Sequence, residues 1–209
     1  MTFEQFVGQC PLVAILRGLT PEDALGTGQA LVDAGFCIIE VPLNSPRPFE
    51  SISILQESLG RRALIGAGTV LSTTAVDSVA AAGGKLIVMP HCNTEVISYA
   101  KSLGLYCVPG IATPTEAFAA LDAGADALKL FPAESATPAL VKAMLAVLPK
   151  STSILPVGGI APDTMAGYWG AGAAGFGLGS ALYKPGISIE QVGLNAAAFI
   201  EAIEALKQG

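Results

Sequence analysis

The amino-acid sequence alternates short apolar runs with amphipathic segments, and the runs recur about every twenty residues. The runs that we interpret as strands are residues 12–16, 37–41, 63–67, 86–89, 106–108, 127–131, 153–157 and 175–178. A short run of Val, Ile and Leu bounded by Gly or Pro is typical of a buried strand. Because helical patterns separate the runs, we expect parallel strands in a sheet that helices cover.

The segments between the runs carry helix start and stop patterns. Thr20-Pro21-Glu22-Asp23, Pro114-Thr115-Glu116 and Pro162-Asp163 resemble helix starts, with proline or acidic residues in the first turn. Glycines at helix ends precede several strands, at Gly35, Gly83, Gly124 and Gly172. Eight such units without a linker predict a single domain over residues 1–209: a (β/α)₈ barrel with a short N-terminal helix. An open doubly wound sheet is the alternative architecture.

Composition excludes several classes of function. The net charge of −6, without a basic run, argues against a nucleic-acid partner. Hydrophobic residues make up 52% and charged residues 13%, so we expect part of the surface to be buried in an oligomer. Residues 164–183 form a long uncharged run, but its six glycines disfavour a membrane-spanning helix. Without a secretion signal or CxxC spacing, the chain is expected to be cytoplasmic, with reduced thiols.

A lysine interrupts one of the apolar runs. In the run 127–131, Lys129 and Phe131 are expected to face one side, and Leu128 and Leu130 the other. Burial lowers the pKa of a lysine and leaves part of the amine neutral, which makes it a nucleophile toward carbonyls. The structural alternative is a lysine that extends its amine to solvent or pairs with a buried carboxylate.

Two further charged residues stand at the ends of predicted strands, where a barrel carries its active site. Glu40 lies in an apolar strand, and burial there raises the pKa of a carboxyl into the range of a general acid or base. It could instead form a structural ion pair with Lys129. Arg17 is placed to bind a carboxylate through two hydrogen bonds, or to form a surface ion pair.

Glycine-rich ends follow the seventh and eighth predicted strands. Gly158-Gly159 and Gly179-Ser180 occupy the positions where barrels commonly bind phosphate through backbone N–H groups. Ordinary turns also explain such glycines. His91 is the only histidine, and no metal-ligand spacing is present. The Gly66-Ala67-Gly68 segment lacks the rest of a dinucleotide-binding motif.

Several motifs together resemble one family. They occur in this order: Ala14-Ile15-Leu16-Arg17-Gly18, Glu40-Val41-Pro42-Leu43-Asn44-Ser45-Pro46, Gly66-Ala67-Gly68-Thr69-Val70, Lys129-Leu130-Phe131-Pro132 and Val157-Gly158-Gly159. Over nearly its whole length the chain resembles the class I aldolases of the 2-keto-3-deoxy-6-phosphogluconate/galactonate family. The resemblance implies a homotrimeric (β/α)₈ barrel that makes or cleaves an aldol bond through a pyruvate Schiff base, without a metal or cofactor.

The resemblance also implies roles for individual residues. Lys129 is the expected Schiff-base lysine and Glu40 the proton shuttle. Arg17 and Thr69 are expected to hold the pyruvate carboxylate, and Pro90 and Phe131 to line the pocket. The residues expected to hold the phosphate are Gly158, Gly159, Gly179 and Ser180.

The substrate follows from the residues after Glu40. Gluconate-type members of the family carry Arg-Thr where this chain has Asn44-Ser45, and the Asn-Ser-Pro form is similar to the galactonate-type branch. Asn44 therefore favours 2-dehydro-3-deoxy-6-phosphogalactonate, cleaved reversibly to pyruvate and glyceraldehyde 3-phosphate. The His91-Cys92 pair receives no role.

Other functions remain open at this point. The gluconate epimer or an unphosphorylated keto acid could be the substrate of the same chemistry. A phosphate-binding barrel isomerase or decarboxylase would keep the glycines but would not need Lys129 inside the barrel. A sugar-phosphate-binding barrel without catalysis would bind its ligand without turnover.

Overall fold

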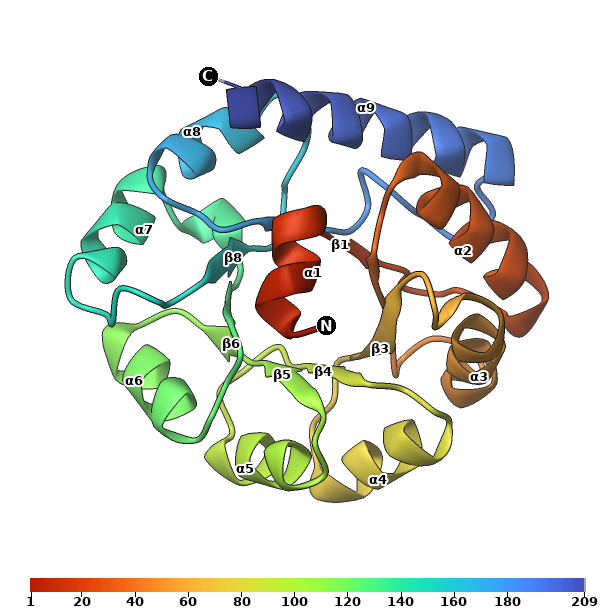
Figure 1. The fold of residues 1–209 in the computed structure, drawn as a ribbon, viewed down its shortest axis with the longest axis horizontal. Coiled ribbons are helices and arrows are strands. Elements are labelled where there is room, and N and C mark those ends of the chain that lie inside the picture. The colour runs from red at the N-terminus through yellow and green to blue at the C-terminus, as the bar shows by residue number, and fades with distance from the viewer. Residues whose placement is uncertain (209) are drawn as a thin grey trace.

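The computed structural model describes residues 1–208 as an α/β fold in which helices surround a curled parallel sheet (Figure 1). The strands are β1 (Leu12–Ile15), β2 (Ile38–Pro42), β3 (Leu64–Gly68), β4 (Leu86–Val88), β5 (Tyr106–Val108), β6 (Gly110–Ile111), β7 (Leu128–Leu130), β8 (Ile154–Pro156) and β9 (Phe176–Leu178). Each of the eight predicted runs overlaps one strand, and β2 and β3 extend one residue beyond their runs. The two-residue β6 was not predicted from the sequence.

The helices fill the intervals between the strands. They are α1 (Phe3–Gln9), α2 (Pro21–Ala34), α3 (Pro48–Leu59), α4 (Thr73–Ala81), α5 (Thr94–Ser102), α6 (Pro114–Asp122), α7 (Pro138–Leu145), α8 (Met165–Gly170), α9 (Ile189–Gln208) and the 3₁₀ turn η1 (Ala133–Ser135). No helix within residues 1–208 has both the length and the apolar character needed to cross a membrane. The uncharged run 164–183 is divided between α8 and β9.

All strand pairs are parallel, and their order follows the chain. One sheet has the order β5-β4-β3-β2-β1-β9, and the other has β6-β7-β8. Pro109 alone separates β5 from β6, and a parallel bridge joins Val157, after β8, to Gly177 of β9. The register sets Glu40 opposite Gly66, and Lys129 opposite Gly110. Parallel pairing brings the C-terminal ends of the strands to one face, where the predicted site residues gather.

The predicted N-terminal helix is present as α1, which lies over the centre of the ring in Figure 1. Thr2 and Gln5 form a capping box that satisfies two N–H groups at the start of the helix. Phe3 and Val7 are buried. Phe3 reaches residues inside the sheet, among them Val13 and Leu86 near the beginnings of their strands. The helix therefore covers the end of the sheet opposite the candidate site.

Helix boundaries agree with the sequence patterns except at α8. Gly35, Gly83, Gly124 and Gly172 all adopt the left-handed conformation at helix ends, as expected. The prediction of a helix start at Pro162-Asp163 was wrong, because α8 begins at Met165. The hydroxyl of Thr164 accepts a hydrogen bond from the N–H of Ala161 (2.9 Å). This bond closes a turn over residues 161–164, so the helical conformation begins only after it.

Candidate active site

Lys129 is the middle residue of β7 and points into the interior of the curled sheet. Only 6% of its surface is exposed. Its Nζ atom lies 4.9 Å from the centre of the Phe131 ring, so the two side chains share one side of the strand as predicted. This distance is within the range of a cation–π interaction, which favours the charged amine over the ring face.

Glu40, at the centre of β2, is the second charged group inside the sheet. It is 1% exposed, and its Oε2 atom has no hydrogen-bond partner within residues 1–208. Gly68 of the neighbouring strand leaves room for the carboxylate, because a Cβ atom at position 68 would overlap Oε2. An acceptor without a partner is unusual in a protein interior, and at this position it is available to a bound molecule.

Burial shifts the two groups in opposite directions. Desolvation raises the pKa of Glu40 from its ordinary 4.5 to about 7, although the positive charges of Lys129 and Arg17 act to lower it. Desolvation lowers the pKa of Lys129; Glu40 acts against this shift, and Arg17 adds to it. The ion pairs of residues 1–208 do not include a Glu40–Lys129 pair. The structure therefore does not support the alternative in which Glu40 and Lys129 form a direct ion pair.

An open cavity of about 580 Å³ lies at the C-terminal ends of the strands, next to Lys129. It brings together seven of the eleven predicted site residues: Arg17, Lys129, Phe131, Gly158, Gly159, Gly179 and Ser180. Beneath it is a second, smaller space of about 20 Å³, which we call the inner void. Lys129 and Glu40 both line the inner void, so Lys129 connects the open cavity with the carboxylate below it.

The other three predicted residues, Asn44, Thr69 and Pro90, line neither space. Asn44 accepts a hydrogen bond from Nη1 of Arg17 (3.0 Å). Thr69 directly follows Gly68 and has the left-handed φ of 55°, which is rare for a β-branched residue. Backbone bonds of Leu43 to Gly68 and of Val70 to Val88 fix the chain on both sides of it. Pro90 packs its backbone against Gly110, the strand partner of Lys129.

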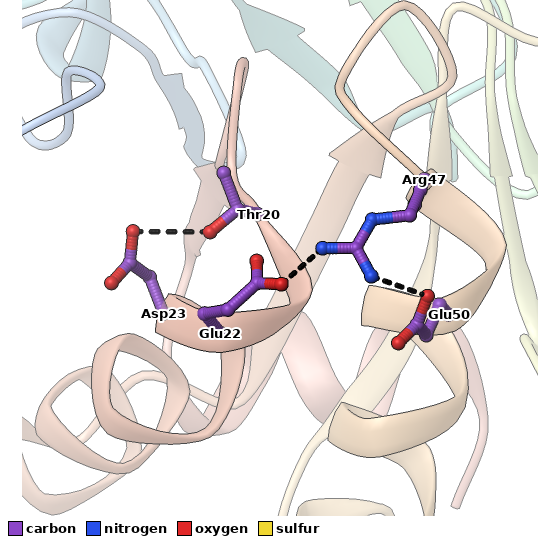
Figure 2. Close-up of polar contacts among 5 residues, drawn as sticks. All are labelled: Thr20, Glu22, Asp23, Arg47 and Glu50. Atoms are coloured by element: carbon purple, nitrogen blue, oxygen red, sulfur yellow. Dashed lines mark hydrogen bonds and ion pairs between the residues drawn. The ribbon is translucent and has the colours of Figure 1, made fainter.

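The loop after β2 is joined at three points to the segment after β1, which includes the first turn of α2. Besides the Arg17–Asn44 bond, the N–H of Gly18 donates to the hydroxyl of the buried Ser45 (2.9 Å). Figure 2 shows the third point, where the Arg47 guanidinium lies between Glu22 and Glu50. The ion pairs of Arg47 are exposed, so each contributes little to stability. Together with the two hydrogen bonds, they fix the two segments relative to each other.

Two charged residues of the open cavity were not predicted from the sequence. Glu134, in η1, lies against the glycine pair: a Cβ atom on Gly158 would come within 2.7 Å of its Oε2. Lys184 lies in the loop after β9. Gly158 and Gly159 also have left-handed φ angles of 109° and 65°, which require glycine there. Both charged residues stand in the loops just after predicted strands, and this position is the sequence signal that would have identified them.

The remaining polar groups give no sign of a metal centre. Within residues 1–208, no group of three or more His, Cys, Asp or Glu side chains could hold a metal ion. All four cysteines are free thiols, of which Cys10, Cys37 and Cys107 are buried. The hydroxyl of Tyr168 is used within the fold, since it donates to the carbonyl oxygens of Ala133 and Ala136.

The parallel α/β fold keeps a lysine and a carboxylate in its apolar interior, under an open cavity. Burial shifts the pKa values of both groups, which is typical of an enzyme active site. Residues 3–196 match the family described as KDPG and KHG aldolase. The chain belongs to this family and is therefore an aldolase, a lyase.

Individual relatives agree with this membership. The chain is 48% identical to the 2-dehydro-3-deoxy-6-phosphogalactonate aldolase of Escherichia coli K12, over 95% of this chain and 97% of that protein. A solved structure described as native KDPGal is also 48% identical, with a TM-score of 0.95 over 96% of this chain and 98% of that one. The KDPG aldolase of Legionella pneumophila, solved with pyruvate captured as a covalent carbinolamine, is 26% identical, with a TM-score of 0.82 over 97% of each chain.

Proposed function

We propose that this chain cleaves 2-dehydro-3-deoxy-6-phosphogalactonate reversibly to pyruvate and glyceraldehyde 3-phosphate through a Schiff base on Lys129. The observation that carries the proposal is the burial of Lys129 and Glu40 on one inner void, below an open cavity, in a member of this aldolase family. The pyruvate carbinolamine of the Legionella relative supports the covalent route. No cofactor or metal is part of the proposed chemistry.

The reaction begins at the amine of Lys129. Because burial lowers its pKa, more of the amine is neutral than in an exposed lysine, and the neutral amine attacks the C2 ketone of the substrate. Nitrogen adds to C2 to form a carbinolamine, and loss of its hydroxyl as water leaves an iminium. Glu40 supplies and removes the protons for these steps, since its pKa of about 7 allows both forms near neutral pH.

Carbon–carbon cleavage follows from the iminium. Glu40 removes the proton of the C4 hydroxyl, the C3–C4 bond breaks, and its electron pair passes into the iminium to form an enamine. Glyceraldehyde 3-phosphate leaves, C3 of the enamine is protonated, and water releases pyruvate from Lys129. Lys129 and Glu40 both line the inner void, which is the proposed route for these protons.

The other predicted residues have binding roles in this proposal. Arg17 and Thr69 bind the pyruvate carboxylate, while Phe131 and Pro90 shape the surroundings of Lys129. Asn44 determines the preference for the galactonate epimer, supported by its hydrogen bond to Arg17 and by the similarity to the E. coli enzyme. The phosphate binds at the far end of the open cavity, whose residues are Gly158, Gly159, Gly179 and Ser180.

The architecture proposed for this function is one (β/α)₈ barrel domain over residues 1–209, in which β5 and β6 act as a single strand interrupted at Pro109. The strand order and the Val157–Gly177 bridge support closure of the sheet. We also propose a homotrimer in the cytoplasm. Exposed apolar side chains such as Phe49, Leu71 and Phe118 are consistent with surface that is buried between subunits.

Borohydride reduction in the presence of pyruvate tests the proposal. The wild-type protein is expected to gain one reduced pyruvate adduct, which peptide mass spectrometry places on Lys129. Lys129→Ala is expected to form no adduct and to lose turnover while circular dichroism shows an intact fold. Turnover of the two epimers, measured side by side, is expected to favour the galactonate. Absence of an adduct on folded wild-type protein would instead favour a phosphate-binding isomerase.

A further inference from the structure

The far end of the open cavity holds a carboxylate where the proposed function needs to bind a phosphate. The Glu134 side chain lies over the glycine pair, with Oε2 placed 2.7 Å and Cγ 2.5 Å from where Cβ atoms of Gly158 and Gly159 would stand. Backbone N–H groups alone would have to attract a phosphate dianion against this negative charge. A cation at the same end of the cavity would offset it.

Lys184 is the cation of the open cavity that the proposed function leaves without a role. Three cationic side chains line the open cavity, and Arg17 and Lys129 belong to the pyruvate end in the proposed function. Lys184 instead lies in the loop after β9 that also carries Gly179 and Ser180. Within residues 1–208 it forms no ion pair, so its charge is not already neutralised by a neighbouring carboxylate.

The loop holds the backbone of Lys184 at the rim of the open cavity, and the side chain itself is exposed. Leu182 and Tyr183, before it, are buried, and the carbonyl of Leu182 accepts a hydrogen bond from Nδ2 of Asn195 in α9 (3.1 Å). Pro185, after it, packs on Gly18: a Cβ atom there would come within 2.5 Å of Cγ of the proline. The backbone of Lys184 is therefore fixed on both sides, which reduces the entropy lost when its side chain binds an anion.

We propose that Lys184 binds the terminal phosphate of the substrate and that Glu134 weakens this binding by its negative charge. This inference rests on the proposed function for the identity of the ligand. It assigns to the open cavity one cation and one anion that tune its affinity for a phosphomonoester, besides the backbone N–H groups. Removing the lysine leaves the carboxylate as the only charged side chain beside the phosphate.

Titration with inorganic phosphate, followed by calorimetry, tests the assignment without turnover. Lys184→Ala is expected to weaken phosphate binding about tenfold to a hundredfold, the usual effect of losing a charge-assisted hydrogen bond. Lys184→Arg is expected to keep most of the affinity. Glu134→Gln, which keeps the size of the side chain, is expected to tighten binding about twofold to fivefold. Lys150→Ala, at an exposed position outside the cavity, is the matched control.

A second readout compares glyceraldehyde 3-phosphate with glyceraldehyde as the aldehyde condensed with pyruvate. Lys184→Ala is expected to reduce the preference for the phosphorylated aldehyde by the factor found in the titration. Equal phosphate affinity in wild type and Lys184→Ala would refute the assignment, as would a rise in the KM for pyruvate alone. The borohydride adduct distinguishes the aldolase function from the role of Lys184. An adduct on Lys129 without weaker phosphate binding in Lys184→Ala would support the function and refute the role of Lys184. Weaker phosphate binding without an adduct would support the anion site and refute the aldolase function.

Discussion

Glu40→Gln is expected to change how the stability of the protein depends on pH. The substitution replaces a fully buried carboxyl by a neutral group of nearly the same shape. Burial raises the pKa of Glu40 from 4.5 to about 7, so the folded chain binds this proton more tightly than the unfolded chain does. Glutamine carries no proton in this range, and its contribution to stability therefore does not change with pH.

The size of the effect follows from linkage. The favourable contribution of the protonated Glu40 is fully present below the unfolded pKa of 4.5, and it is lost as the pH rises through about 7. At about 1.4 kcal/mol for each pH unit between the two pKa values, the whole change is about 3 kcal/mol. Relative to Glu40→Gln, the wild type should therefore lose about 2–3 kcal/mol of unfolding free energy between pH 5 and pH 8.

Urea unfolding of both proteins at pH 5 and pH 8, at one protein concentration, measures this difference. Glu57→Gln controls for the removal of an exposed carboxylate. Because the charge of Lys129 lowers the pKa of Glu40, the same comparison in a Lys129→Met background should move the loss to higher pH. A difference between wild type and Glu40→Gln that stays constant within about 0.5 kcal/mol across this range would refute the reasoning.

Two further substitutions test how the site is held. Gly68→Ala is expected to destabilise the protein by about 1–3 kcal/mol and to reduce the pyruvate adduct, because the new methyl group overlaps the Glu40 carboxylate. Urea unfolding and borohydride trapping measure both effects, and Gly170→Ala, where the methyl group would meet open space, is the control. Ser45→Ala is expected to cost about 1–2 kcal/mol, because the N–H of Gly18 loses its acceptor. It should also raise the KM for pyruvate through the neighbouring Arg17, whereas an unchanged KM would limit Ser45 to a structural role.

The strands could be predicted because burial on both sides of a parallel sheet leaves continuous apolar runs. The same rule cannot find β6, since Gly110–Ile111 is too short to show a period and directly follows Pro109. The start of α8 was misplaced for a different reason. Pro162-Asp163 has the composition of a helix start, but the hydroxyl of Thr164 bonds to Ala161 and delays the helix, a competition that composition does not reveal.

The two central site residues could be predicted because a charge inside an apolar strand is rare. Glu40 and Lys129 stand out against the apolar residues on both sides of them. Glu134 and Lys184 do not stand out, since charged residues are ordinary in loops. Their connection with the site depends on how the loops after β7 and β9 fold over the open cavity. The resemblance to the aldolase family carries the remaining assignments, and their roles stay proposals.

The interior of the sheet shows why the chemistry is placed where it is. Among residues 1–208, five polar or charged residues are buried, and Glu40 and Lys129 are the two of them that ionise. Both line the inner void, and Oε2 of Glu40 has no hydrogen-bond partner in the described part of the chain. A structural ion pair would satisfy both groups. It would lower the pKa of the carboxyl and raise the pKa of the amine. The opposite shifts occur: burial raises the pKa of Glu40 to about 7 and lowers the pKa of Lys129, as proton transfer during Schiff-base chemistry requires. The unpaired Glu40 and Lys129 therefore stabilise the fold less than a direct ion pair would, but they suit the proposed reaction.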